Sequence, residues 1–107
     1  MATFKSLGLN PKLLHSIEKL GFETPTEVQV KVIPLLLDNS TDLIALAQTG
    51  TGKTASFVLP IIEILNNQKS KARMPRSLIL TPTRELAEQI SIYFKKILKN
   101  NKLNFCL

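Results

Sequence analysis

The feature that most limits the fold of this chain is an apolar run followed at once by a glycine-containing loop and a helix. Residues 43–47 are apolar without alternation, which is typical of a strand covered on both faces of a parallel sheet. The next residues include Gly50 and Gly52, and apolar side chains at helical spacing then continue from residue 57 to 65. A strand, a tight loop and a helix in this order predict part of an α/β domain.

The sequence after this unit continues the same pattern. A basic stretch, residues 69–76, leads to a second apolar run at 78–81, where we expect another buried strand. Thr83 can cap a further helix whose apolar stripe continues to Leu98, and residues 103–107 begin a third strand. The expected fold class is therefore α/β, with a partial parallel sheet and flanking helices.

Two helices are predicted before the first strand. Asn10 can cap a helix that has Pro11 at its first position and ends at Gly21. The residues Thr24-Pro25-Thr26-Glu27 read as a capping box, with proline at the first helical position, and start a second helix. Pro34 lies inside this second helix and should kink it or tighten its last turn.

Composition limits the size of the core and the kind of partner. With 107 residues, 44% of them hydrophobic, the chain can bury one modest core. Fourteen Lys and Arg against eight Asp and Glu give a net charge of +6, which favours a polyanion such as nucleic acid. No apolar stretch approaches the roughly 20 residues of a membrane span. We therefore expect no membrane partner. Since the single cysteine, Cys106, cannot form an internal disulfide, a reducing cytoplasm is the expected compartment.

The loop reads Ala47-Gln48-Thr49-Gly50-Thr51-Gly52-Lys53-Thr54, the pattern of a phosphate-binding loop with Ala47 in place of its first glycine. The backbone amides of such a loop face one point at the positive end of the following helix. Lys53 and Thr54 are the expected catalytic residues, since the ammonium would neutralise the outer phosphates and the hydroxyl would bind magnesium. The alternative is a glycine-rich turn without a ligand, which the coincidence of strand, loop, Lys-Thr and helix disfavours. The predicted nucleotide-binding residues here are Gln48, Thr49, Gly50, Thr51, Gly52, Lys53, Thr54 and Ala55.

Three motifs, in this order, resemble those of DEAD-box ATP-dependent RNA helicases. Residues 21–29, Gly-Phe-Glu-Thr-Pro-Thr-Glu-Val-Gln, resemble the Q motif, and Phe4 lies 17 positions before Gly21, at the family's spacing. Residues 47–54 have the form of motif I, and residues 81–87, Thr-Pro-Thr-Arg-Glu-Leu-Ala, resemble motif Ia. The resemblance covers nearly the whole chain. It implies a Q-motif helical region at 1–41 and the first part of a RecA-like P-loop ATPase domain at 42–107, truncated and without a second domain.

The resemblance also implies roles for residues outside the phosphate loop. The Gln29 carboxamide would donate to and accept from one edge of adenine and so select ATP, while Phe4 would stack on the base. Without the resemblance, Gln29 would be a polar residue near a helix start and Phe4 a packing residue beside the first helix. Pro82, Thr83 and Arg84 would hold a phosphate of an RNA strand, although Thr83 could also cap its helix.

Hydrolysis in this family needs an acidic residue that follows a later strand. Residues 35–38, Leu-Leu-Leu-Asp, imitate such a motif, but they precede the phosphate loop and continue a capped helix. We therefore expect the N-terminal fragment of an RNA-stimulated ATPase that unwinds short RNA duplexes. The fragment would give ATP binding, with magnesium, and one RNA contact, without hydrolysis on its own because the second RecA-like domain is missing. The alternative is a non-catalytic remnant that binds nucleotide weakly or not at all.

Overall fold

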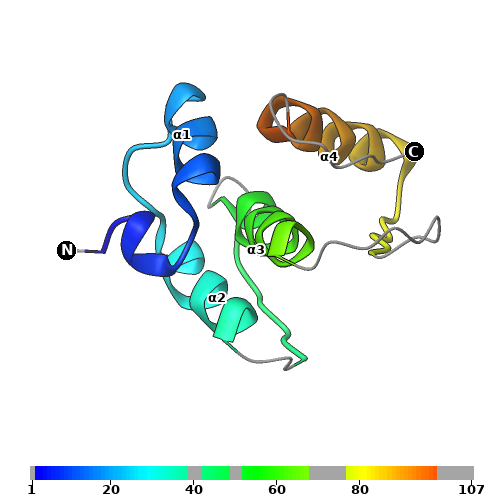
Figure 1. Ribbon diagram of the computed structural model, residues 1–107. Coiled ribbons are helices and arrows are strands. Elements are labelled where there is room, and N and C mark those ends of the chain that lie inside the picture. The colour runs from blue at the N-terminus through cyan, green and yellow to red at the C-terminus, as the bar shows by residue number, and fades with distance from the viewer. Residues whose placement is uncertain (1, 39–41, 49–51, 68–76, 99–107) are drawn as a thin grey trace.

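The computed structural model describes residues 2–38, 42–48, 52–67 and 77–98. The elements in these ranges are a short 3-10 helix, η1 (Lys5–Leu7), and the helices α1 (Pro11–Lys19), α2 (Glu27–Asp38), α3 (Lys53–Asn67) and α4 (Arg84–Ile97). Figure 1 shows α3 at the centre, with α1 and α2 on one side and α4 on the other. Helix α2 packs against α3 and η1, and α1 contacts α4.

The caps predicted for α1 and α4 are confirmed. The Asn10 Oδ1 atom accepts a hydrogen bond of 2.9 Å from the Leu13 backbone N–H, with Pro11 at the first helical position. Gly21 follows α1 with a φ of +91°, a conformation that favours glycine. The Thr83 hydroxyl oxygen accepts from the Leu86 N–H at 3.2 Å and starts α4. These starts are set by short-range chemistry that the sequence displays directly.

The predicted start of α2 is wrong by two residues. The expected capping box paired Thr24 with Glu27, but α2 begins only at Glu27. The reciprocal pair is instead formed by Thr26 and Gln29: the Thr26 N–H donates to Gln29 Oε1 at 2.9 Å, and the Gln29 N–H donates to the Thr26 hydroxyl oxygen at 3.4 Å. The pairs Thr24–Glu27 and Thr26–Gln29 both have the spacing of a capping box. The second pair forms, with the Gln29 side chain turned into the structure.

The partial parallel sheet is not confirmed, because the described residues contain no β-strand. Residues 42–48 and 77–81 have no regular secondary structure; Figure 1 draws the first as an extended trace and places the two segments on opposite sides of α3. Their apolar side chains remain in solvent, with Ile44 89% and Leu46 93% exposed. A strand is defined by the hydrogen bonds it makes with a neighbour, so two separated segments do not make a sheet. The third predicted strand, at 103–107, lies outside the described residues.

The hydrophobic core lies around α3 and thereby fixes the helix that follows the phosphate loop. Val58, Leu59 and Ile62 of α3 are fully buried. They belong to one cluster with Ile17 of α1, Ile33 of α2 and other apolar residues of these helices and of α4. Burial of each large aliphatic side chain contributes roughly 1.5–3 kcal/mol to stability. The first turn of α3 is therefore held in place by the apolar residues that follow it.

Candidate nucleotide-binding site

The last residues of the phosphate-loop motif form the start of α3. Lys53 is the first residue of this helix and is exposed, Thr54 is half-buried, and Ala55 is buried. The first four N–H groups of a helix have no acceptor within it, so they are available to an anion. An ammonium, a hydroxyl and these amides at one helix end are groups that suit a triphosphate with its magnesium ion. Gln48 precedes the site and is exposed, whereas Thr49, Gly50 and Thr51 lie outside the described residues.

Gln29 is the residue that joins α2 to the phosphate loop. Its side chain is buried, with 4% exposed. While Oε1 accepts from the Thr26 N–H, Nε2 donates to the Gly52 carbonyl oxygen at 3.2 Å. The carboxamide therefore lies against the last residue of the loop before Lys53. Gln29 is thus a polar residue at a helix start, as expected without the family resemblance, and its recognition of adenine stays a prediction.

Gly52 fits this contact only as glycine. Its φ of +83° is one that residues with a side chain rarely adopt. A Cβ atom at this position would also lie 2.5 Å from Gln29 Nε2 and 3.2 Å from the Thr26 hydroxyl oxygen. Glycine is therefore required at position 52 for two reasons: its backbone conformation, and the lack of room for a side chain where the loop approaches α2.

Phe4, the expected base-stacking residue, is 6% exposed and belongs to the core. Its ring lies 5.8 Å from the Phe22 ring at 45°, and Phe22 lies 6.2 Å from Tyr93 of α4 in an edge-to-face arrangement. Burial raises the pKa of Tyr93 to about 12, so its phenol stays neutral in alkaline solution where an exposed tyrosine would ionise. Stacking on a base would require that one face of Phe4 be uncovered, and its role in base binding stays a prediction.

The expected RNA contact lies at the start of α4. Thr83 acts as the helix cap, while Pro82 is exposed and the Arg84 side chain is 87% exposed. Arg84 Nε lies 3.7 Å from Glu88 Oε1, one helical turn away. Such solvent-exposed ion pairs contribute only about 0.2–1 kcal/mol to stability, so a phosphate could replace the Glu88 carboxylate at little cost.

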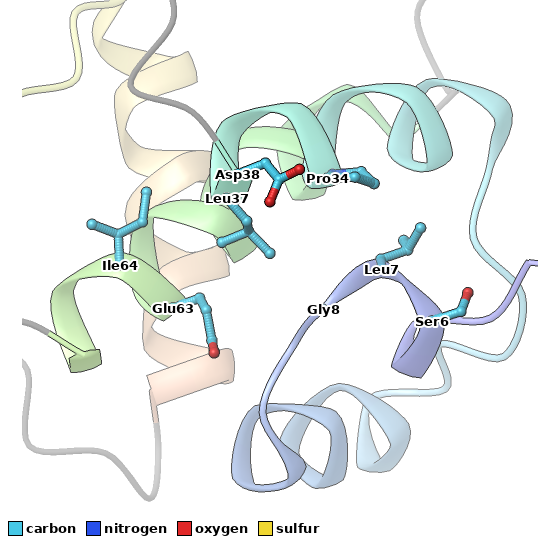
Figure 2. Close-up of a pocket in the computed structure, with 8 residues that line it drawn as sticks. All are labelled: Ser6, Leu7, Gly8, Pro34, Leu37, Asp38, Glu63 and Ile64. Carbon is cyan, nitrogen blue, oxygen red and sulfur yellow. The ribbon is translucent and has the colours of Figure 1, made fainter.

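Two shallow pockets flank α3. The first, of about 450 Å³, is shown in Figure 2 and contains none of the predicted site residues. It is lined by Ser6, Leu7, Gly8, Pro34, Leu37, Asp38, Glu63 and Ile64. The second, of about 470 Å³, includes Lys53 and lies between α2, α3 and the extended segment. Its other lining residues are Val32, Leu36, Asp42, Leu43, Ala45, Ser56 and Phe57.

Two further observations concern metals and membranes. Across residues 2–38, 42–48, 52–67 and 77–98, His, Cys, Asp and Glu side chains form no group of three or more that could hold a metal ion by themselves. In the same ranges, no helix has both the length and the apolar character that crossing a membrane requires.

Comparison with known proteins identifies the family. The sequence profile of the DEAD/DEAH box helicases matches residues 26–107, which include α2, Gln29 and the phosphate loop. The chain belongs to the DEAD/DEAH box helicase family. This DEAD-box chain is 47% identical over 96 residues to the ATP-dependent RNA helicase DBP9 of Debaryomyces hansenii. That match covers 90% of this chain and 16% of the relative.

Solved structures agree with this assignment. The DEAD-box chain matches the RNA helicase Prp28 from Chaetomium thermophilum bound to ADP with a TM-score of 0.84 and 38% identity, over 92% of this chain and 24% of that one. It matches S. cerevisiae Dbp5 bound to RNA and ADP BeF3 with a TM-score of 0.81 and 36% identity, over 92% and 25% of the two chains. These neighbours are RecA-like helicase domains, which confirms this part of the expected fold class. The chain spans about a sixth of the length of curated relatives such as DBP9.

Proposed function

We propose that this chain supplies the ATP-binding site and one RNA contact of an RNA-stimulated ATPase that unwinds short RNA duplexes. In this proposal residues 1–41 form the Q-motif helical region and residues 42–107 the first part of the RecA-like P-loop domain. The observation that carries it is the hydrogen bond from Gln29 to the Gly52 carbonyl. This bond holds the Gln29 carboxamide, the group proposed to recognise the base, against the last residue of the phosphate loop, where one nucleotide could contact both. We expect the cytoplasm as its location, since Cys106 has no partner cysteine in the chain.

The roles of the residues follow from their positions. At the start of α3, Lys53 and Thr54 would bind the outer phosphates and magnesium, which neutralises phosphate charge when it is bound. Gln29 has four hydrogen-bonding positions in its carboxamide, and the two bonds seen here use one acceptor site and one donor hydrogen. The remaining acceptor and donor are enough for one edge of adenine. Gln29 can thus take part in the capping box of α2 and hold the loop, and in this proposal it selects the base once its side chain, like Phe4, is uncovered.

The first prediction concerns base selection by Gln29. Replacing Gln29 with Ala should weaken binding of ATP much more than binding of inorganic tripolyphosphate, because only ATP carries the base. The variant should also lose some stability, about 0.5–1.5 kcal/mol for each of the two side-chain bonds removed, those with the Thr26 N–H and the Gly52 carbonyl. Isothermal titration of both ligands, with thermal unfolding in parallel, separates these two effects.

Gln29→Glu is the matched variant for that experiment. Its carboxylate can still accept from the Thr26 N–H and cap α2, but it has no hydrogen to donate to adenine or to the Gly52 carbonyl. We expect it to lose the preference for ATP while α2 stays capped, and to lose stability as well, because its buried carboxylate would face the Gly52 carbonyl oxygen. Equal ATP affinity in the original chain and in both variants would make the adenine assignment wrong.

The second prediction concerns RNA and Arg84. Removing the exposed guanidinium, as in Arg84→Ala, should lower RNA affinity about equally for different sequences, because a phosphate contact carries no base information. The slope of log affinity against log salt should fall by about one. Fluorescence anisotropy with two short RNAs of unrelated sequence, at several salt concentrations, measures both. Lys96→Ala, at the other end of α4, removes the same charge as a control, and a loss confined to one RNA would indicate base readout instead.

The alternative function, a remnant that binds nucleotide weakly, is favoured by one observation. Residues 42–48 and 77–81 leave several large apolar side chains in solvent, among them Ile44, Leu46, Leu78 and Leu80. Exposed apolar runs of this kind promote association between chains. Sedimentation of the purified chain, with and without ATP, distinguishes a monomer that binds nucleotide from an aggregated remnant.

A further inference from the structure

A buried carboxylate on α3 holds the segment that leads into α1. Glu63 is 5% exposed, and its Oε2 atom accepts two hydrogen bonds from Asn10, at 2.7 Å from the side-chain Nδ2 and at 3.3 Å from the backbone N–H. Asn10 in turn caps α1 through its Oδ1 atom. Figure 2 shows Glu63 projecting from α3 on the side where η1 and Gly8 lie. One side chain thus connects α3 with the start of α1, 53 residues earlier in the sequence.

Among the described residues, a second polar attachment joins the same parts of the chain. It is the Gln29 bond to Gly52, just before the start of α3. Glu63 lies 11 residues further along, which corresponds to about 16 Å of helix. Residues 2–38, which we call the base-recognition region because they contain Gln29 and Phe4, are therefore tied to α3 near both its ends. A body attached at one point can pivot, whereas attachment at two points sets its orientation.

Packing also holds the region against α3, since Leu13 and Ile17 share one core cluster with Ile62, but the packing is interrupted beside Glu63. The pocket of about 450 Å³ in Figure 2 opens there between η1, the last turn of α2 and α3. It is lined by Leu7 and Gly8 on one side and by Leu37 and Ile64 on others. Apolar contact across such a gap is non-directional and tolerates sliding. The two hydrogen bonds of Glu63 are directional, and its charge makes them stronger than bonds between neutral groups.

We propose that Glu63 is a positioning residue that fixes the base-recognition region in register with the phosphate loop. This inference rests on the proposed ATP-binding function and adds the residue that aligns the two halves of the site. Lys53 and Thr54 belong to α3 itself, so they keep their geometry if the region pivots. If the region pivots about the remaining bond from Gln29 to Gly52, Phe4 is displaced and the Gln29 carboxamide turns, and recognition of a base tolerates only about 0.5 Å of displacement. Glu63 therefore acts on the adenine part of the affinity and leaves the phosphate part unchanged.

The test compares ATP with inorganic tripolyphosphate by isothermal titration of the full chain with magnesium. Glu63→Leu removes both accepted bonds, and we expect the ratio of ATP affinity to tripolyphosphate affinity to fall about tenfold, the lower end of what a hydrogen bond to a charged group contributes. Glu63→Gln keeps an oxygen acceptor and should retain most of the ratio. Glu18→Leu is the matched control, because it removes an exposed carboxylate of α1. Circular dichroism confirms that each variant is folded at the titration temperature.

A pair of variants tests whether Glu63 acts through Asn10. Asn10→Asp places a second carboxylate beside Glu63 and should lower the ratio, while still capping α1. In the double variant with Glu63→Gln, the amide introduced at position 63 can donate to the carboxylate introduced at position 10, which reverses the direction of the original bond. This variant should restore the ratio. Restoration supports the inference even if Glu63→Leu fails to fold. An unchanged ratio in Asn10→Asp and in a folded Glu63→Leu overturns it, as does an equal loss for both ligands. If the unaltered chain binds ATP no more tightly than tripolyphosphate, the proposed adenine site is wrong as well.

Discussion

Replacing Lys53 with alanine in a full-length helicase that carries these residues abolishes RNA-stimulated ATP hydrolysis and leaves the fold intact. The ammonium is the positive side chain at the first position of α3, where the outer phosphates are expected to bind. Loss of one group that stabilises charge in a transition state typically costs 10²–10³ in rate, so activity should fall by at least about 10². Phosphate release in the presence of RNA and magnesium measures this loss.

The fold should survive because Lys53 is exposed and contributes nothing to the core around Val58 and Ile62. Circular dichroism and the thermal midpoint of Lys53→Ala should match those of the unaltered protein. Lys12→Ala, an exposed lysine in the first turn of α1, is the control that removes the same charge elsewhere. Turnover at the unaltered rate in Lys53→Ala would rule out the phosphate-loop assignment.

The helices of this protein could be predicted from sequence because their signals are short-range. Asn10 and Pro11 start α1, Thr83 starts α4, and the apolar residues that follow each cap have the helical period. The wrong start predicted for α2 also has a local cause: two capping-box pairs, Thr24 with Glu27 and Thr26 with Gln29, have the same spacing. Only the direction of the Gln29 side chain, which depends on Gly52, decides between them.

The sheet and the cross-chain bonds could not be predicted in the same way. Residues 43–47 have the composition of a buried strand, but strand formation needs a neighbouring strand, and composition does not show whether one is close enough. The bond from Gln29 to Gly52 spans 23 residues and that from Asn10 to Glu63 spans 53. No periodicity or local motif links residues at such distances. Glu63 in particular reads as a polar residue on an apolar helix, and only its burial shows that it is a structural acceptor.

The 107-residue chain by itself should release no phosphate from ATP above background, even with magnesium and RNA present. Hydrolysis needs a carboxylate that follows a strand, where it can hold the metal and orient water. The acidic residues that the structure describes have other positions. Glu63 is engaged by Asn10, Glu27 lies 3.2 Å from Lys31 and Glu88 lies near Arg84. Asp42 lines the pocket that includes Lys53, but it precedes the extended segment 43–47 and so lies at the end away from the loop.

The arginine that the family supplies from a second RecA-like domain is a further requirement, worth about 10³–10⁵ in rate where such residues act. We therefore expect ATP binding without turnover, and the two are separable by titration calorimetry and a phosphate-release assay on the same sample. A Lys53→Ala chain, purified and assayed in the same way, controls for contaminating ATPases. A monomeric, cooperatively folded 107-residue chain that hydrolyses ATP in an RNA-dependent way would contradict this prediction. Such turnover would require one of the acidic residues above to leave its observed position. Replacing Asp42 with Asn would be the first variant to identify it, because Asp42 lines the same pocket as Lys53.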